Sequence, residues 1–148
     1  MLENNHKNIA TFIHLSTFSR FVFPLGNFIA PILLWALNKG KSEFVDAHGK
    51  QAINFQISIL LYTVIIGMLT IPFFIFKFMS GIDYIDFNGF ENFHFNIHEP
   101  SPLLYFTGGL GILAVFGFLL ELVFIVIASL KARDGELYRY PLTITFLK

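Results

Sequence analysis

The sequence contains no cysteine and very little charge. Without cysteine the chain can form no disulfide, no thiolate metal site and no cysteine nucleophile. Only 14% of its 148 residues are charged and 55% are hydrophobic, whereas an average soluble domain has about 25% charged residues. A soluble domain would lack the polar surface to cover so much apolar area, so the composition predicts a membrane protein. The ten basic and ten acidic residues balance, which excludes the basic surplus of a nucleic-acid-binding protein.

The sequence also lacks the motifs of common catalytic sites. It has no nucleophile elbow, no phosphate-binding loop and no HExxH pattern. The glycines between Gly108 and Gly111 lie at the start of an apolar stretch, where close helix packing is a better explanation than phosphate binding. We therefore expect no enzyme activity, no cofactor and no bound metal.

Three apolar stretches predict an all-α integral membrane protein with a single membrane domain, residues 1–148. A membrane span needs about 20 apolar residues, and the segments 51–78 and 103–131 qualify as regular spans. The segment 21–38 is shorter and contains Pro24 and Pro31. It can cross only as a kinked helix, or enter as half of a re-entrant hairpin. Residues 9–23 mix apolar and polar side chains and predict an amphipathic interfacial helix, so the fold has three transmembrane helices plus this helix, or forms a four-segment bundle.

The charges of the connecting segments are segregated. Seven of the ten Lys and Arg residues lie in the connection 38–50 or from Lys131 onward. The connection 79–102 is acidic and aromatic and has no Lys or Arg. Short positive loops stay in the cytoplasm. The pattern predicts a multi-pass protein of the bacterial cytoplasmic (inner) membrane, with loop 38–50 and the tail 132–148 inside and loop 79–102 outside. Charge does not decide the side of the N-terminus.

Glu121 is the most informative single residue. It lies ten positions before Lys131, which places it about 15 Å of helix from the charged boundary, near the centre of the apolar core. Asn27 and Tyr62 lie at similar depths, and Thr63 follows Tyr62. We predict an intramembrane polar cluster of Glu121, Asn27, Tyr62 and Thr63. Either it is a proton or ion site, or a protonated Glu121 joins helices through hydrogen bonds.

The segment that contains Glu121 also carries small residues at helical spacing, and these predict a face on which another helix packs closely. The stripe consists of Thr107, Gly111, Ala114, Gly117 and Ala128. Polar residues of the connection 38–50, of the start of the following span and of the tail predict a cytoplasmic collar. This collar either docks another protein or contacts lipid head groups. Its members are Asp46, His48, Asn54, Gln56, Arg133, Tyr138, Arg139 and Tyr140.

Three strings carry a family resemblance: FPLGNFIAPILLW (23–35), EFVDAHGKQAINFQIS (43–58) and KARDGELYRYPLTITF (131–146). They resemble a widespread bacterial family of small polytopic membrane proteins of unknown function. That family is distantly similar to the twenty-kilodalton membrane subunit of the chloroplast inner-envelope import translocon. The resemblance implies a bundle of three to four helices and a role beside protein translocation or membrane assembly.

The leading functional hypothesis is a non-enzymatic accessory or scaffold subunit of a larger membrane complex, linked to protein translocation or insertion. Its expected partners are membrane lipids and other membrane-protein subunits, a protein translocon among them, and no nucleic acid. The alternative is a small oligomeric ion or proton channel, or a transporter, in which Glu121 lines a pathway between subunits.

Overall fold

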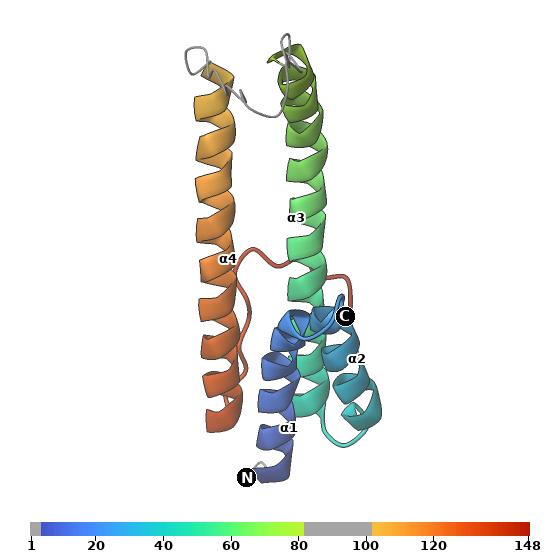
Figure 1. The fold of residues 1–148 in the computed structure, drawn as a ribbon. Coiled ribbons are helices and arrows are strands. Elements are labelled where there is room, and N and C mark those ends of the chain that lie inside the picture. Colours follow the sequence, from blue (N-terminus) through green and yellow to red (C-terminus); the bar gives the residue numbers. More distant parts are fainter. Residues whose placement is uncertain (1–3, 82–101) are drawn as a thin grey trace. The chain divides into compact units, whose positions relative to one another are not determined.

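The computed structural model describes residues 4–81 and 102–148, and every regular element in these residues is a helix. The elements are α1 (Asn4–Leu15), the 3-10 helix η1 (Ser16–Phe21), α2 (Gly26–Asn38), α3 (Glu43–Gly81) and α4 (Pro102–Asp134) (Figure 1). The all-α prediction is confirmed for this part of the chain. The predicted outer loop 79–102 falls almost entirely outside the described residues.

Two helices, not three, are long and apolar enough to cross a membrane by length and composition. These are Glu43–Pro72 within α3 and Gly108–Asp134 within α4. The prediction of three spans is therefore wrong for the residues that the structure describes. The reason lies before α2: Leu25 adopts a left-handed conformation with φ 60°, so the helix begins only at Gly26. Its 13 residues extend about 20 Å, too short for an apolar core of about 30 Å.

Hydroxyl side chains explain why α1 ends where it does. Ser16, Thr17 and Ser19 each donate a hydrogen bond to the carbonyl three residues earlier, at 2.6–2.7 Å. Such local bonds compete with α-helical bonding and tighten the chain into the 3-10 turn of η1. The chain then reverses toward α2, and Gly26 packs so closely that a Cβ there would overlap the backbone of Ser19. The segment 4–38 thus forms a helical hairpin, which we call the N-terminal hairpin.

The chain divides into two compact units, and the first contains the packed core. It consists of the described residues of Met1–Tyr62 together with Phe118–Lys148. Ser42 caps the start of α3 by accepting a 3.2 Å hydrogen bond from the Val45 amide. Helix α1 of the hairpin lies beside the end of α4, as the packing of Ala10 with Ala132 and Phe44 shows. The lower part of Figure 1 shows α1 and α2 beside the beginning of α3.

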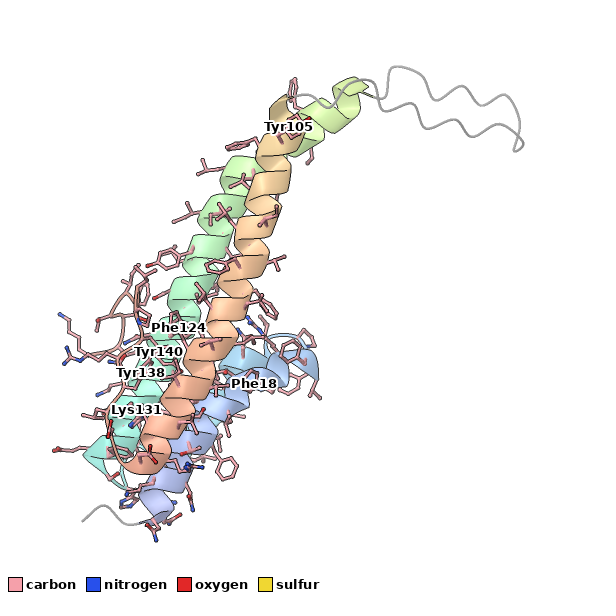
Figure 2. All side chains as sticks on the ribbon, turned by 90° about the vertical axis from the view of Figure 1, so that its left-hand side faces the viewer. Phe18, Tyr105, Phe124, Lys131, Tyr138 and Tyr140 are labelled. Carbon is pink, nitrogen blue, oxygen red and sulfur yellow. The ribbon has the colours of Figure 1, made fainter. Side chains whose placement is uncertain are left out.

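The C-terminal tail, residues 135–148, is extended and folds back along this unit. Gly135 has φ 87° and the amide of Glu136 donates to the Lys131 carbonyl at 2.9 Å, a glycine-based helix end. The tail runs back beside α4, turns at Pro141–Leu142 and continues along α3 (Figure 1). In the side view Tyr138 and Tyr140 project from it near Phe124 (Figure 2), and Tyr140 packs with Phe55 and Ile125 in the largest apolar cluster.

The second unit is the described part of Thr63–Gly117 and contains the remaining parts of α3 and α4. Its apolar side chains are largely exposed, from Val64 to Phe76 on α3 and from Tyr105 to Phe116 on α4. An aqueous protein would bury such surfaces, so this unit has the character expected of helices surrounded by lipid or by other helices.

Candidate functional site

An ion pair joins the turn of the N-terminal hairpin to the middle of α4. Arg20 Nη1 lies 2.8 Å from Glu121 Oε1, at an angle outside hydrogen-bond geometry. The Glu121 side chain is 3% exposed and that of Arg20 is 23% exposed. Glu121 precedes the last residue of α4 by 13 positions, or about 20 Å of helix. A carboxylate buried this far from the helix end needs a compensating charge, and Arg20 supplies it.

Two amide side chains extend this ion pair to the other helices. Gln56 on α3 donates from Nε2 to Glu121 Oε1 at 3.3 Å. Asn27 on α2 donates from Nδ2 to Gln56 Oε1 at 2.8 Å. Arg20, Glu121, Gln56 and Asn27 form what we call the ion-pair network, and it fastens η1, α2, α3 and α4 to one another. Asn27, Gln56 and Glu121 are buried, whereas Arg20 is the partly exposed member of the network.

This network overlaps with the predicted intramembrane cluster only in part. Asn27 and Glu121 are brought together, but through Gln56, which the sequence assigned to the collar. The hydroxyl of Tyr62 donates instead to the Leu142 carbonyl at 2.7 Å, and Thr63 belongs to the second unit. Sequence reasoning missed Arg20. The available signal was that Arg20 is the only Lys or Arg between residues 8 and 38, just as Glu121 is the only charged residue of the apolar segment before Lys131. Two isolated opposite charges in apolar segments are candidates for an ion pair.

A second network lies nearer the open end of the hairpin and contains two histidines and a tyrosine. His14 Nε2 and His48 Nδ1 are 2.8 Å apart, and the Tyr140 hydroxyl lies 2.9 Å from His14 Nδ1. All three residues are buried. This histidine network, as we call it, joins α1, α3 and the tail. His48 Nε2 is buried and makes no hydrogen bond of regular geometry among the described residues, although the His48 ring lies close to the backbone of Glu136.

Burial sets the protonation state of the two network residues that are not on α3, His14 and Tyr140. It lowers the pKa of His14 from 6.5 to about 3, and the adjacent His48 lowers it further in the same direction. Burial also raises the pKa of Tyr140, with smaller contributions from Tyr138 and Glu121. Both groups are therefore neutral near pH 7, which suits hydrogen bonding in an apolar interior.

The predicted collar residues occupy several separate sites. Asp46 accepts a hydrogen bond from Trp35 Nε1 at 2.8 Å and pairs with Lys50 at 2.5 Å. The remaining members are distributed as follows: His48 and Tyr140 are in the histidine network, Gln56 is in the ion-pair network, Asn54 binds the tail, Tyr138 contacts Tyr140, and Arg133 and Arg139 are exposed. Most of the collar thus holds the first unit together internally.

The small-residue stripe is divided between the two units. Ala128 is buried in the main apolar cluster of the first unit. Gly111, Ala114 and Gly117 are exposed in the second unit, and a Cβ added at Gly111 or Gly117 would meet nothing within 4 Å. Thr107 lies within α4, and its side chain falls outside the described set.

Neither network has the geometry of a metal site. The residues of ranges 4–81 and 102–148 whose side chains are placed include no group of three His, Cys, Asp or Glu side chains that could hold a metal ion. An open apolar groove of about 370 Å³ lies between α1 and α2, with Ile9, Phe12 and Leu34 among its lining residues and no charged side chain. The side chains of the two networks bond to one another across segments of the first unit, while His48 Nε2 and Arg20 Nη1 make no hydrogen bond of regular geometry among the described residues.

The fold and these networks define a helical membrane protein in which two long helices hold a short helical hairpin and an extended tail. Residues 5–147 match the model of the magnetosome magnetite crystal formation protein family (MamF/MmsF), and the chain belongs to that family. The expectation of a small bacterial membrane family is thereby met, whereas no similarity to the chloroplast translocon subunit is shown. No curated protein and no solved structure matches the chain.

Proposed function

We propose that this protein is a non-enzymatic integral membrane accessory protein that serves magnetite crystal formation in the magnetosome membrane. The family supports the process. The ion-pair network supports the accessory role, because Glu121 and its two amide side chains bind one another or Arg20 and so join four segments of the chain. Polar groups that bind one another across a bundle favour a role in stabilising its architecture.

The proposed topology follows from the hairpin. Lys7 on α1 donates to the Asp134 carbonyl at the end of α4, so the N-terminus lies at the same end of the first unit as the tail connection. With α3 and α4 crossing the membrane, the N-terminal hairpin enters about halfway from the basic side and returns to it. Both ends of the N-terminal hairpin then face the cytoplasm, and the acidic connection after α3 faces the opposite compartment.

The proposed partners are other membrane-protein helices and lipids. In the second unit the exposed glycines of α4, Gly108 to Gly117, leave space for close approach of a partner helix. The channel alternative has less support, because Glu121 is closed off by Arg20 and Gln56. It would be favoured over our proposal by proton flux in liposomes containing only this protein, with loss of that flux in Glu121→Gln.

The process is tested by replacing the resident family member of a magnetite-forming bacterium with this chain. We expect crystals of normal size and shape in the replaced strain and altered crystals in the deletion strain, measured by electron microscopy. An Arg20→Glu chain that still reaches the membrane should fail to restore the crystals. Altered crystals with the unmodified chain, present at normal abundance in the membrane, would refute the role in crystal formation.

The accessory role is tested separately by cross-linking in native membranes. A photoreactive side chain at Gly111 or Gly117 should capture a membrane-protein partner, whereas one at the buried position Ala128 should not. If the two exposed positions capture lipid alone, the partner surface proposed for the second unit is wrong.

A further inference from the structure

An open groove runs along the N-terminal hairpin between α1 and α2, and we call it the hairpin groove. Its volume of about 370 Å³ lies within the range of about 300–1,000 Å³ that is common for small-molecule sites. None of its lining side chains is charged, and those of Phe12 and Leu15 are exposed. The lining residues are Ile9, Phe12, Leu15, Ser16, Leu34 and Asn38.

The two polar residues of the hairpin groove are engaged with their own segments. The Ser16 hydroxyl donates to the Ile13 carbonyl at 2.7 Å, and Asn38 Nδ2 donates to the Leu34 carbonyl at 2.7 Å. The other four lining side chains are pure hydrocarbon. A polar occupant would lose its hydrogen bonds to water on such a surface, so the lining favours a hydrocarbon chain.

The hairpin groove is too narrow for a helix. From Ile9 to Ser16 the chain rises about 10 Å. Spread over this length, the volume of 370 Å³ corresponds to a channel about 7 Å across. A helix with its side chains is about 10–12 Å across. A single hydrocarbon chain, which has no side chains of its own, is the narrower occupant.

Two exposed lysines lie at the Asn38 end of the hairpin groove. The Lys41 amide donates to the Asn38 carbonyl at 2.9 Å, so Lys41 lies beside the last residue of the lining. Lys39 follows Asn38 directly, and its Nζ lies 5.0 Å from the centroid of the Trp35 ring. Neither lysine forms an ion pair with another described residue. An apolar groove that ends at unpaired positive charge complements an amphipathic anion.

The other charges of the first unit also favour an anionic ligand. Four of its described acidic residues lie in ion pairs with basic side chains, namely Asp46, Glu121, Asp134 and Glu136, and only Glu43 does not. The basic residues without an ion pair to another described residue are Lys7, Lys39, Lys41, Arg139 and Lys148. Positive charge is therefore left over in this unit, and two of its lysines lie where the groove ends.

Head-group charge, and not burial, would select the lipid. A lipid tail is as apolar as the groove, so it gains no hydrophobic free energy when it moves there from the bilayer. The attraction between a lysine and an anionic head group is absent for a lipid of zero net charge. A groove with lysines at its end should therefore prefer anionic lipids to neutral ones with the same tails.

We propose that the hairpin groove holds one acyl chain of an anionic phospholipid, whose head group lies at Lys39 and Lys41. This inference rests on the proposed topology, in which the basic end of the hairpin lies at the membrane face and its turn lies about halfway in. The bound lipid then has the orientation of its own leaflet, because its chain runs from Asn38 toward Ser16.

The test compares two photoreactive lipids in phosphatidylcholine vesicles that contain the full-length protein. One probe is phosphatidylglycerol and the other is phosphatidylcholine, each with a diazirine in one acyl chain and each at the same low fraction. Attachment sites are mapped by mass spectrometry. Val123 and Val126 on α4 are exposed residues of the same unit and serve as the reference. We expect the preference for the anionic probe to be about fivefold greater at residues 9–16 than at the reference.

Substitution of one lysine separates the groove from general attraction to a basic surface. Lys41→Gln should lower anionic labelling of residues 9–16 about fivefold and leave neutral labelling unchanged. Arg139→Gln is the matched control, because Arg139 is exposed and unpaired among the described residues but does not line the groove. If the Lys41 variant does not accumulate, Lys39→Gln carries the same test.

A second pair of variants tests the wall of the groove. Phe12 is 61% exposed and lines the groove, whereas Phe21 is 64% exposed and does not. Phe12→Ala should reduce the anionic preference at Leu15, and Phe21→Ala should not. Equal effects of the two changes would count against a chain seated beside Phe12.

Two further results would overturn the proposal. An equal anionic preference at the groove and at the reference, or one unchanged by Lys41→Gln and Lys39→Gln, would show an ordinary lipid-exposed surface. Residues 9–16 that neither probe labels would show that the groove holds no lipid. In that case labelling of Leu33, an exposed residue of α2 outside the groove, would leave the topology standing, and its absence would overturn the topology as well. The role in crystal formation is tested separately by the replacement strain.

Discussion

The ion pair between Arg20 and Glu121 can be removed one charge at a time. At 2.8 Å and an effective dielectric constant of about 20, the Coulomb attraction is about 6 kcal/mol. Arg20 is partly exposed, so solvent weakens this attraction. Removing one partner leaves the other buried without compensation, and such changes cost about 3–5 kcal/mol. We expect Arg20→Met to lower the free energy of unfolding by about 3 kcal/mol, and Glu121→Met by a similar amount or less.

The double variant separates the ion pair from simple loss of packing. Replacement of a buried ion pair by apolar residues of similar volume is often neutral. The double variant also leaves the buried Gln56 Nε2 without its acceptor, which costs about 1–3 kcal/mol. We therefore expect Arg20→Met with Glu121→Met to lose no more stability than either single variant, so that the two changes are strongly non-additive. Lys131→Met with Glu136→Met is the control: this pair is 2.6 Å apart but exposed, and its loss should leave stability unchanged.

The chain provides its own probe for this measurement. Trp35 is the only tryptophan, and it lies on α2, packed against Gly49 of α3. Its fluorescence should report release of the N-terminal hairpin during denaturant titration in detergent micelles. The reasoning is refuted if the double variant is as unstable as the sum of the two single variants, since the charges would then contribute independently.

Three further predictions use the same fluorescence assay. The pKa of His14 is about 3 in the folded protein and about 6.5 in the unfolded chain. Its contribution to stability is therefore present above pH 6.5, and below that pH it falls by up to about 1.4 kcal/mol per pH unit. A His14→Gln variant should show a flatter dependence of stability on pH, and an unchanged dependence would contradict the assignment. Gly49→Ala should destabilise by about 2 kcal/mol or more, because a Cβ there overlaps the ring of Trp35, while Gly109→Ala, with open space around it, should not destabilise. Thr143→Val should stabilise by about 1 kcal/mol, because the buried Thr143 hydroxyl has no partner among the described residues; a loss of stability would show that the hydroxyl is bonded.

The regular helices were predictable because length and hydropathy are sufficient to define them. The segments 51–78 and 103–131 lie wholly inside α3 and α4. The start of α3 at Glu43 came eight residues earlier than predicted, because the Ser42 cap and the Trp35–Asp46 hydrogen bond stabilise polar turns that hydropathy ignores. The hairpin was one of two options for the segment 21–38, and only the backbone turn at Leu25 distinguishes them.

The depth of the candidate-site residues along their helices was predictable, but their hydrogen-bond and ion-pair partners were not. Helix rise alone placed Asn27 and Glu121 at one level, and the structure joins them through Gln56. Tyr62 lies at the same depth but turns toward the tail, whose path no periodic pattern encodes. Arg20 was missed because η1 is irregular, so no helical spacing connects it to Glu121.

The polar residues of α3 are concentrated in its first half, and together they bind α1, α2, α4 and the tail. Asp46 holds Trp35 of α2, His48 holds α1, Gln56 holds both α2 and α4, and Asn54 holds the tail. A helix that binds on every side cannot have a single polar face, which is why its polar residues follow no one helical stripe. Substitutions between residues 43 and 62 should therefore disturb assembly of the first unit, whereas apolar exchanges between 63 and 81 should be tolerated unless they face a partner. A scan of α3 thus separates the two kinds of contact: loss of abundance marks internal fastening, and loss of function at normal abundance marks the partner surface.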